Sequence, residues 1–441
     1  MELSRHNILT PVHGSPQWLL ANLLSGQADL LDPEVAEPLA RGELPPAGAA
    51  LDELAQKGYA VEPAAEQKAF RQAYLEFVRN RESDEIQLFY VPTYACNFAC
   101  SYCFQDEYAP RPGQDGAQVL QAFFAYIDSH FAGRRKYVTL FGGEPLLPSH
   151  AARAVVEQLV AGTRARGLDL AVVTNGYHLT DYIPLLQQAR IRAIQVTLDG
   201  PAAVHDARRM LRGGAGTFAQ VAQGVTAALQ AGMAVNLRAV LDRSNLEAFA
   251  DLARYAIDAG WTGNPLFKTQ IGRNYELHHC QSERAQLYTR LQLFQDLYEL
   301  IQRRPEVLEL HKPAYSVAKF LFERGELPAP LFDSCPACKS EWAFDYTGAI
   351  YPCTANVGKT GEAVGRFWPQ TELSEPDVAA WHARDVLEIE ACGSCNLRLA
   401  CGGGCGAVAK NQTGQIAAPD CRPVAELLGL GTALYGEFDV G

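Results

Sequence analysis

Three cysteines stand close together near residue 100, where three thiolates on one loop could hold a metal centre. Cys96, Cys100 and Cys103 are separated by three residues and then by two. Three thiolates hold three irons of a [4Fe–4S] cube and leave the fourth iron free to bind another molecule, which distinguishes a catalytic cluster from an electron carrier. The same residues could instead be three of the four ligands of a zinc ion. The spacing alone leaves both interpretations open.

The last quarter of the chain carries a second set of candidate metal ligands. The eight residues are Cys335, Cys338, Cys353, Cys392, Cys395, Cys401, Cys405 and Cys421. Pairs separated by two residues are typical of metal ligation, either by iron–sulfur clusters or by zinc. Of the twelve cysteines in the chain, only Cys280 remains outside the two sets, and we expect it to be an ordinary thiol.

The elements that must position these residues alternate along the chain from residue 85. Strand-like runs are expected at 86–91, 137–141, 170–174, 193–198, 235–240 and 266–271. Helical apolar spacing separates them, at 119–131, 154–166, 218–231 and 246–259. This alternation predicts an α/β fold with a parallel sheet. Six repeats without a reversal of order favour a partial (β/α)6 barrel over a doubly wound sheet.

Unusual residues follow the predicted strands at their carboxyl ends, where parallel barrels build active sites. The first cysteine loop follows the first strand, and Gly142-Gly143-Glu144-Pro145 follows the second. Thr174-Asn175 ends the third strand, Asp199 follows the fourth, and Arg238 lies late in the fifth. Glycines let the backbone approach closely, and a buried carboxylate suits an ammonium partner. The polar residues could equally be strand-end groups that satisfy the backbone.

The composition favours a globular protein of two or three domains. The chain has 441 residues, of which 48% are apolar and 20% charged. Its formal net charge of -12 argues against a surface that neutralises phosphates, so we expect no nucleic-acid partner. No apolar run approaches the ~20 residues that span a bilayer, and the first residues lack the apolar core of a secretory signal, so we expect a cytoplasmic protein. A local basic cluster at 208–212 fits either a solvated face or a basic groove.

Together the motifs resemble the radical S-adenosylmethionine (SAM) superfamily. Its signature has three cysteines at this spacing with an aromatic residue before the last, the place that Tyr102 fills here. Gly142–Pro145 resembles its second motif, whose backbone and glutamate hold the methionine amino group. The resemblance implies an enzyme in which the free iron of a [4Fe–4S] cluster binds SAM. It also implies cofactor contacts from a set of softer matches, namely Thr174, Asn175, Asp199 and Arg238.

The second cysteine set resembles the SPASM extension of some radical SAM enzymes, which carries two auxiliary [4Fe–4S] clusters. By position, the first auxiliary cluster would take Cys335, Cys338, Cys353 and Cys405. The second would take Cys392, Cys395, Cys401 and Cys421. If all eleven of these cysteines are ligands, neither auxiliary cluster has an open iron. The auxiliary clusters would then transfer electrons and not bind substrate. If Cys335 were not a ligand, the first auxiliary cluster would offer an iron to substrate.

The resemblance also implies the chemistry. Reductive cleavage of SAM gives a 5′-deoxyadenosyl radical that abstracts hydrogen, with the electron supplied by a reductant such as flavodoxin or ferredoxin. SPASM enzymes characteristically modify peptides, so we expect a ribosomally made precursor peptide with a leader as substrate and a thioether or C–C cross-link as product.

Several alternatives remain. Anaerobic sulfatase maturases, which make formylglycine, share the architecture. They place an aspartate base directly after the cysteine of a Gly-x4-Cys motif, which in this chain is Gly348 to Cys353, and the next residue here is Thr354. An epimerase would need a hydrogen donor, for which Cys280 is the spare thiol. A zinc-stabilised binding protein without catalysis is the alternative from another class.

The domain boundaries expected from these patterns divide the chain into five parts. Residues 1–80 resemble a winged-helix peptide-recognition domain, with an unrelated cap domain as the alternative. The partial barrel is expected at 85–275, a helical bridge at 276–330, the SPASM domain at 331–425 and a short apolar tail at 426–441.

Overall fold

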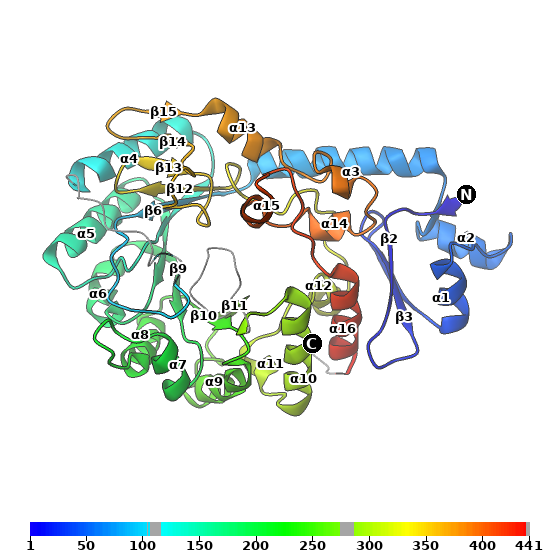
Figure 1. The fold of residues 1–441 in the computed structure, drawn as a ribbon, viewed down its shortest axis with the longest axis horizontal. Coiled ribbons are helices and arrows are strands. Elements are labelled where there is room, and N and C mark those ends of the chain that lie inside the picture. Colours follow the sequence, from blue (N-terminus) through cyan, green and yellow to red (C-terminus); the bar gives the residue numbers. More distant parts are fainter. Residues whose placement is uncertain (104, 106–115, 274–285, 438–441) are drawn as a thin grey trace.

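The computed structural model describes the chain except residues 104, 106–115, 274–285 and 438–441 (Figure 1). It contains a ten-stranded sheet at the centre, helices along the outer side of that sheet, and a small N-terminal unit at one end of the molecule.

Six parallel strands form the centre of the molecule, as the sequence predicts. They are β6 (Ile86–Val91), β7 (Lys136–Leu140), β8 (Asp169–Thr174), β9 (Arg190–Thr197), β10 (Val235–Leu241) and β11 (Phe267–Arg273). Neighbours in the sheet follow the order of the chain, and each of the five pairings is parallel. The predicted α/β fold is therefore confirmed, and the unreversed order fits a partial barrel.

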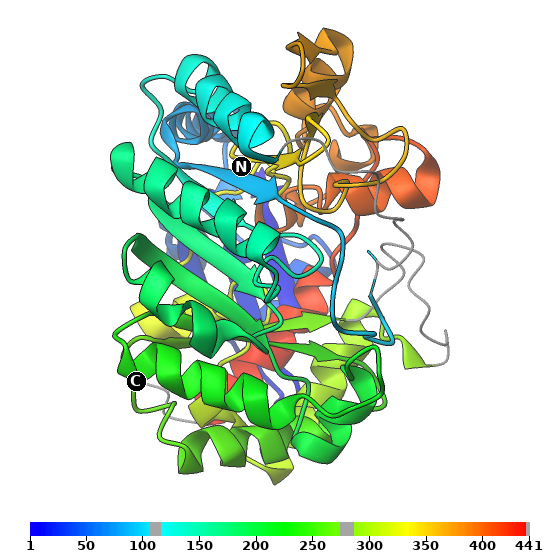
Figure 2. The same cartoon turned by 90° about the vertical axis from the view of Figure 1, so that its left-hand side faces the viewer.

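Helices cover the outer face of these strands, where Figure 2 shows them in front of the sheet. They are α4 (Gly116–His130), α5 (His150–Ala165), α6 (Leu179–Leu186), α7 (Ala202–Arg208), α8 (Phe218–Gln230) and α9 (Leu246–Asp258). Alternate strand residues such as Leu88 and Tyr90 are fully or almost fully buried. The Tyr90 ring lies 4.9 Å from that of Phe123 on α4, centroid to centroid. The helices thus bury one face of each strand and leave the other face to the interior of the barrel.

The cysteine-rich region is joined to the barrel by a shared sheet. Its first strand, β12 (Glu341–Asp345), pairs parallel with β6 and is followed by the antiparallel β13 (Ala349–Tyr351). Two short strands, β14 (Gly365–Arg366) and β15 (Glu372–Leu373), extend the same sheet. The boundary expected at residue 331 is therefore no break in the sheet. Periodicity could not predict this pairing because about 250 residues separate the two strands.

Short helices make up much of the remaining C-terminal part. Between barrel and cysteines lie α10 (Arg290–Arg303), α11 (Val307–Leu310) and α12 (Ala318–Arg324). Around the cysteines lie α13 (Glu375–Ala383), a 3-10 helix (Glu390–Cys392), α14 (Arg398–Cys401) and α15 (Gly406–Thr413). The last helix, α16 (Val424–Glu437), occupies most of the segment that we expected to be a tail.

The N-terminal unit contains two small sheets and three helices. β1 (Glu2–Leu3) pairs with β5 (Ala60–Val61), and β2 (Asn7–Pro11), β3 (Trp18–Asn22) and β4 (Gln27–Leu31) form an antiparallel sheet. The helices are α1 (Pro33–Ala40), α2 (Ala49–Gln56) and α3 (Pro63–Ser83). Figure 1 shows α3 running from this unit along the top of the molecule.

Helix α16 fastens this unit to the rest of the chain. The Thr10 hydroxyl donates a hydrogen bond to the Ala425 carbonyl over 3.0 Å, and the His13 amide donates to the Gly429 carbonyl over 3.2 Å. A Cβ on Gly429 would lie 2.4 Å from the Pro11 carbonyl oxygen, so only glycine permits this approach.

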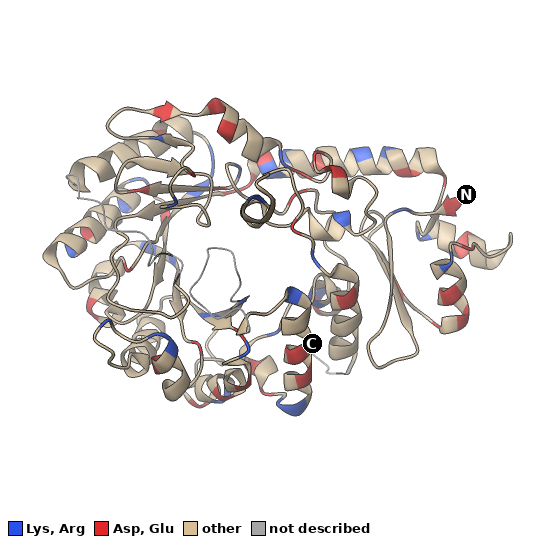
Figure 3. Ribbon diagram, viewed as in Figure 1, with Lys and Arg blue, Asp and Glu red and all other residues tan. Residues whose placement is uncertain are grey.

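Lys, Arg, Asp and Glu residues are frequent along the outer helices and along α3 (Figure 3). None of the helices among the described residues is both long and apolar enough to cross a membrane.

Candidate functional site

The cysteine loop that follows β6 is held against the glycine loop that follows β7. The Gly143 amide donates to the Thr93 carbonyl over 3.0 Å, and the Glu144 amide donates to the Ala95 carbonyl over 2.8 Å. A Cβ on Gly143 would lie 2.3 Å from the Ala95 oxygen, and one on Gly142 would lie 2.6 Å from the Thr93 oxygen. Both glycines are therefore required by the close approach of two backbones, which is the reason we predicted for them.

Glu144 is buried at the point where these loops meet the end of β8. Its Oε1 accepts hydrogen bonds from the Thr174 hydroxyl (2.7 Å) and the Leu146 amide (2.8 Å). Its Oε2 accepts from the Asn175 amide over 2.6 Å. Burial raises the pKa of Glu144, and the three hydrogen bonds oppose that rise. Among the described residues no Lys, Arg or His forms an ion pair with this carboxylate, so it is suited to the ammonium group of a ligand.

Asn175 connects the end of β8 to the cysteine loop directly. Its side-chain amide donates to the Asn97 side-chain oxygen over 2.8 Å and lies 3.8 Å from the Cys96 sulfur. Thr174 and Asn175 are thus brought to Cys96 and Glu144, as their places on the strand predict. Their contact with a cofactor stays a prediction.

The basic cluster at 208–212 lies against the cysteine loop. The Ala99 amide donates to the Met210 carbonyl (2.9 Å), and an antiparallel bridge joins Phe98 to Leu211. Arg208 and Arg209 are each only 8% exposed. The interpretation of this cluster as a solvated face is therefore wrong for Arg208 and Arg209, whose guanidinium groups are buried close to the cysteine loop, whereas Arg212 is exposed.

A buried network joins Tyr102 to Asp199. The Tyr102 hydroxyl donates to Asp199 Oδ2 over 2.6 Å and accepts from Arg209 Nη1 over 2.7 Å. The Val240 amide donates to Asp199 Oδ1 (2.9 Å), and Arg208 Nε lies 3.4 Å from Asp199 Oδ2. The hydrogen bonds of Tyr102 and Asp199 therefore connect the cysteine loop to β9 and β10.

Arg238 lies on β10 beside Thr197 of β9 and Gln270 of β11. Its guanidinium lies where a side chain on Gly272 would stand, since a Cβ there would be 2.8 Å from Nη2. Its buried Nε has no hydrogen-bond partner among the described residues. The side chain is therefore available to an anionic group, although none of its contacts joins it to the cysteine loop.

Thiols of the same predicted set influence one another's pKa, and the assignment of the sets to clusters stays a prediction. The pKa of Cys96 is raised to about 12. Burial is the largest cause of this rise, and Glu144, Cys100 and Cys103 contribute to it. Burial likewise raises the pKa of Cys392 to about 11, with added repulsion from Cys401, Cys395 and Cys421.

The remaining group surrounds Cys353. Burial raises the pKa of Cys353, and Cys335 and Cys405 are among its neighbours that raise it further; Cys335 acts in the same way on Cys338. Among the described residues no three Cys, His, Asp or Glu side chains converge on a single ion. The ligands of a [4Fe–4S] cube each bind a different iron, so they need to surround a cube and not to meet at one point.

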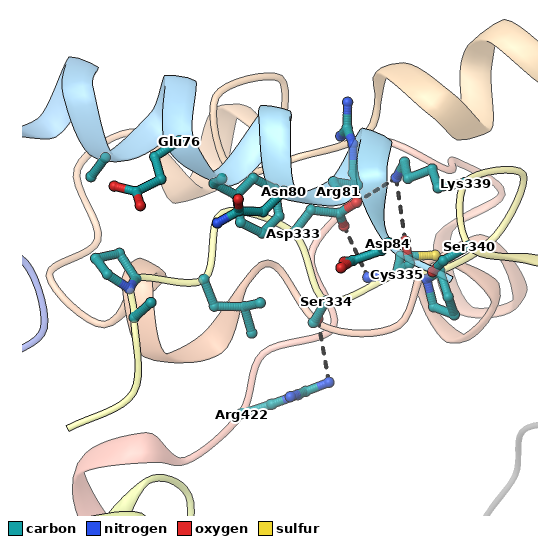
Figure 4. A pocket seen from close by; sticks show the side chains of 16 residues that line it. Glu76, Asn80, Arg81, Asp84, Asp333, Ser334, Cys335, Lys339, Ser340 and Arg422 are labelled. Atoms are coloured by element: carbon teal, nitrogen blue, oxygen red, sulfur yellow. Dashed lines mark hydrogen bonds and ion pairs between the residues drawn. The ribbon is translucent and has the colours of Figure 1, made fainter. Parts of the chain in front are cut away.

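A cavity of about 530 Å³ opens beside the first auxiliary group (Figure 4). Helix α3 and residues 329–340 line it, and it reaches Cys335. Here Lys339 and Asp333 form an ion pair of 2.5 Å in which each side chain is only 2% exposed. Asp333 also accepts the Cys335 amide over 2.9 Å, so the pair holds the backbone of a predicted ligand.

Thr354 has a partner that sequence reasoning missed. Its hydroxyl and its amide donate to Glu341 Oε1 over 2.8 and 2.7 Å. Burial raises the pKa of Glu341, and Thr354 opposes the rise. No sequence motif includes Glu341. It contacts Thr354 through the pairing of β12 with β13, which local sequence patterns do not reveal. Cys280 lies outside the described residues.

Comparison with known proteins places the central part of the chain in a family. Residues 90–256 match the Radical SAM superfamily. This segment is a radical SAM domain. The predicted superfamily is thus confirmed for this segment, and the family implies a [4Fe–4S] cluster and SAM as cofactors.

The chain is also similar to individual proteins. It is 36% identical to a GTP 3',8-cyclase of Campylobacter fetus over 109 residues, which cover 24% of this chain and 32% of that one. The chain spans about a third to a half of the length of the first curated relatives that it matches.

Two solved structures share the fold more fully. The sulfatase maturase anSMEcpe with bound AdoMet matches with a TM-score of 0.62 at 15% identity, covering 80% of this chain and 97% of that one. Streptococcus suis SuiB bound to its precursor peptide SuiA matches with a TM-score of 0.55 at 14% identity, covering 96% and 99%.

Proposed function

We propose that this protein is a radical SAM maturase that cross-links residues of a ribosomally made peptide. The observation that carries the proposal is the arrangement around Glu144, where the cysteine loop, the glycine loop and the end of β8 are joined by hydrogen bonds. When bound, the cluster and SAM supply a 5′-deoxyadenosyl radical that abstracts hydrogen, and auxiliary clusters take up the electron left behind.

The residues of the chain have distinct parts in this proposal. Cys96, Cys100 and Cys103 hold the catalytic cluster. Glu144 receives the methionine ammonium group, because its carboxylate is buried and has no cationic partner among the described residues. Arg238 offers to a carboxylate its guanidinium, whose buried Nε has no hydrogen-bond partner among the described residues. Thr174 and Asn175 orient Glu144, while Tyr102 and Asp199 keep the cluster loop in place.

The eight C-terminal cysteines would hold two auxiliary clusters in the two sets predicted from their positions. Support comes from the mutual effects of their thiols, which connect Cys335 with Cys338 and Cys353, and Cys392 with Cys421. Cys335 is 5% exposed and lies with the other members of its set, which favours its role as a ligand.

A peptide substrate is supported by the neighbours and by the N-terminal unit. SuiB is bound to a precursor peptide, and anSMEcpe is described with bound Cp18Cys peptide. In this chain β4 is an edge strand, and a cavity of about 630 Å³ lies between β4, α1 and α2. Leu30 and Val35 are about half exposed beside it. An extended leader could add to the free edge of β4 and place apolar side chains in this cavity.

Formylglycine formation is the second candidate, because of the likeness to anSMEcpe. The contact between Thr354 and the buried Glu341 brings a carboxylate next to the position where those enzymes carry an aspartate. A product assay separates the two activities, since formylglycine is an aldehyde and a cross-link is not.

The test uses anaerobically reconstituted protein with dithionite, SAM and synthetic peptides from short reading frames next to the gene. We expect 5′-deoxyadenosine in a peptide-dependent reaction, and a peptide that has lost two hydrogens and does not react with a hydrazide. A hydrazide-reactive product would favour formylglycine formation. Zinc in place of iron, or no 5′-deoxyadenosine from a fully loaded protein, would leave a metal-stabilised binding protein.

A further inference from the structure

Arg209 is a buried cation directly beneath the first cysteine loop. Its guanidinium lies 5.8 Å from the centre of the Phe98 ring and 5.9 Å from that of Tyr102. Both aromatic residues belong to the segment that carries Cys96, Cys100 and Cys103. Arg209 Nη1 donates to the Tyr102 hydroxyl over 2.7 Å, while its buried Nε has no hydrogen-bond partner among the described residues.

The charge of Arg209 is not neutralised by direct contact, in contrast to that of its neighbour. Arg208 forms ion pairs with Asp242 over 2.9 Å and with Asp199 over 3.4 Å. Arg209 forms no such pair among the described residues and reaches Asp199 only through the Tyr102 hydroxyl. Asp199 and Asp242 thus pair directly with Arg208, and Arg209 brings a second positive charge to the loop without a direct ion pair among the described residues.

That positive charge acts on the cysteine loop. Burial by itself would lower the pKa of Arg209, yet the Cys100 thiol and the acidic groups nearby raise it well above its ordinary range. A guanidinium does not lose its proton in proteins, so the charge is fixed. Because it is buried, its field is screened much less than that of a surface arginine.

We propose that Arg209 sets the reduction potential of the cluster held by Cys96, Cys100 and Cys103, by placing a fixed positive charge beside Cys100. The inference rests on the proposed radical SAM function. Reduction adds one electron from a low-potential donor, and no bond breaks and no proton moves. A nearby cation stabilises the more negative, reduced form, so it raises the potential and makes the electron easier to deliver. Arg209 is in this sense a positioning residue that acts through the cluster.

The test measures the midpoint potential of this cluster in the reconstituted holoenzyme by EPR-monitored redox titration. The cluster is recognised as the one whose signal changes when SAM is added. Arg209→Gln removes the charge, Arg209→Lys keeps it, and Tyr102→Phe removes the hydrogen bond but keeps the charge. Arg190→Gln is the matched control, because Arg190 is a 68% exposed arginine at the opposite end of β9.

We expect Arg209→Gln to shift the midpoint to a more negative potential. The shift should be smaller in Arg209→Lys and in Tyr102→Phe and absent in Arg190→Gln, with the auxiliary potentials unchanged. A wild-type potential in fully loaded Arg209→Gln, or equal shifts in the Lys and Gln variants, would overturn the inference.

If Arg209→Gln loses about four irons, Arg209→Lys decides the matter. Retention of the cluster near the wild-type potential supports the inference, and loss of the cluster there too contradicts it. Failure of the proposed function would look different, since the wild type itself would then show no SAM-sensitive signal and no 5′-deoxyadenosine.

Discussion

The two cysteine regions of this protein differ in how far they are open. Cys96, Cys100 and Cys103 are all partly exposed, on a loop at the carboxyl end of β6. In the C-terminal region five of eight cysteines are buried, and Cys421 is exposed. A cluster that must bind a second molecule needs an open iron, whereas one that only passes electrons can be enclosed. The difference agrees with the proposal that the first region binds SAM and that the second transfers electrons.

The means of support differ as well. The first loop is held by backbone contacts to glycines and to 208–212, together with a buried tyrosine, aspartate and arginine network. The C-terminal region depends on buried ion pairs close to the cysteines, such as Lys339 with Asp333. Changes in one region should therefore leave the cluster of the other intact.

The largest effect should come from the triple variant Cys96→Ala/Cys100→Ala/Cys103→Ala. We expect no 5′-deoxyadenosine and a fall from about twelve irons to about eight, because the two C-terminal sets are left whole. Iron and sulfide analysis with a 5′-deoxyadenosine assay measures both. A fall to about four irons would show that the two regions depend on each other.

Asp333→Ala should destabilise the C-terminal cysteine region and leave the first cysteine loop unchanged. It leaves Lys339 buried without its partner, and breaking a buried ion pair costs about 3–5 kcal/mol. We expect a lower melting temperature and loss of about four irons, with the SAM-sensitive EPR signal retained. Arg41→Ala, which breaks an exposed pair with Glu43, is the control and should change little.

Glu144→Gln should weaken SAM binding at the first cysteine loop and leave the C-terminal cysteine region unchanged. The amide keeps the shape of the side chain but loses the charge that we assign to the SAM ammonium group. A hydrogen bond to a charged group contributes about 1.5–3 kcal/mol, so affinity for SAM should fall roughly 10- to 100-fold. Anaerobic calorimetry measures it, with the exposed Glu157→Gln as control. Unchanged affinity in a fully loaded variant would contradict the role of Glu144.

The smallest effect expected is a pH dependence of stability from His205, which is fully buried on α7. Burial is the main cause that lowers its pKa from 6.5 to about 4. Above pH 6.5 the imidazole is neutral in both folded and unfolded chains and contributes no pH dependence. As the pH falls from 6.5 towards 4, only the unfolded chain takes up the proton, so stability decreases by roughly 3 kcal/mol at most. Melting temperatures of wild type and His205→Gln over this range test it, and equal slopes would contradict it.

Local pattern determined much of this protein. The apolar spacing predicted all six barrel strands within a few residues, since a strand buried by helices must present apolar side chains to them. The spacing of Cys96, Cys100 and Cys103 predicted one ligand set, because ligands on one loop are brought together by the short chain between them, whereas the two C-terminal sets followed from the resemblance alone. Gly142 and Gly143 were identifiable because no other residue permits that backbone approach.

Only the tertiary structure determined the surroundings of residues whose contacts come from distant segments of the chain. The sequence left open whether the basic cluster at 208–212 is a solvated face or a basic groove, and only the long-range contacts of this segment show that Arg208 and Arg209 are buried. Glu341 carries no motif, and it meets Thr354 only because β12 pairs with both β6 and β13. Sequence patterns record which side of its own element a residue occupies, whereas the environment of a buried charge depends on segments far away in the chain.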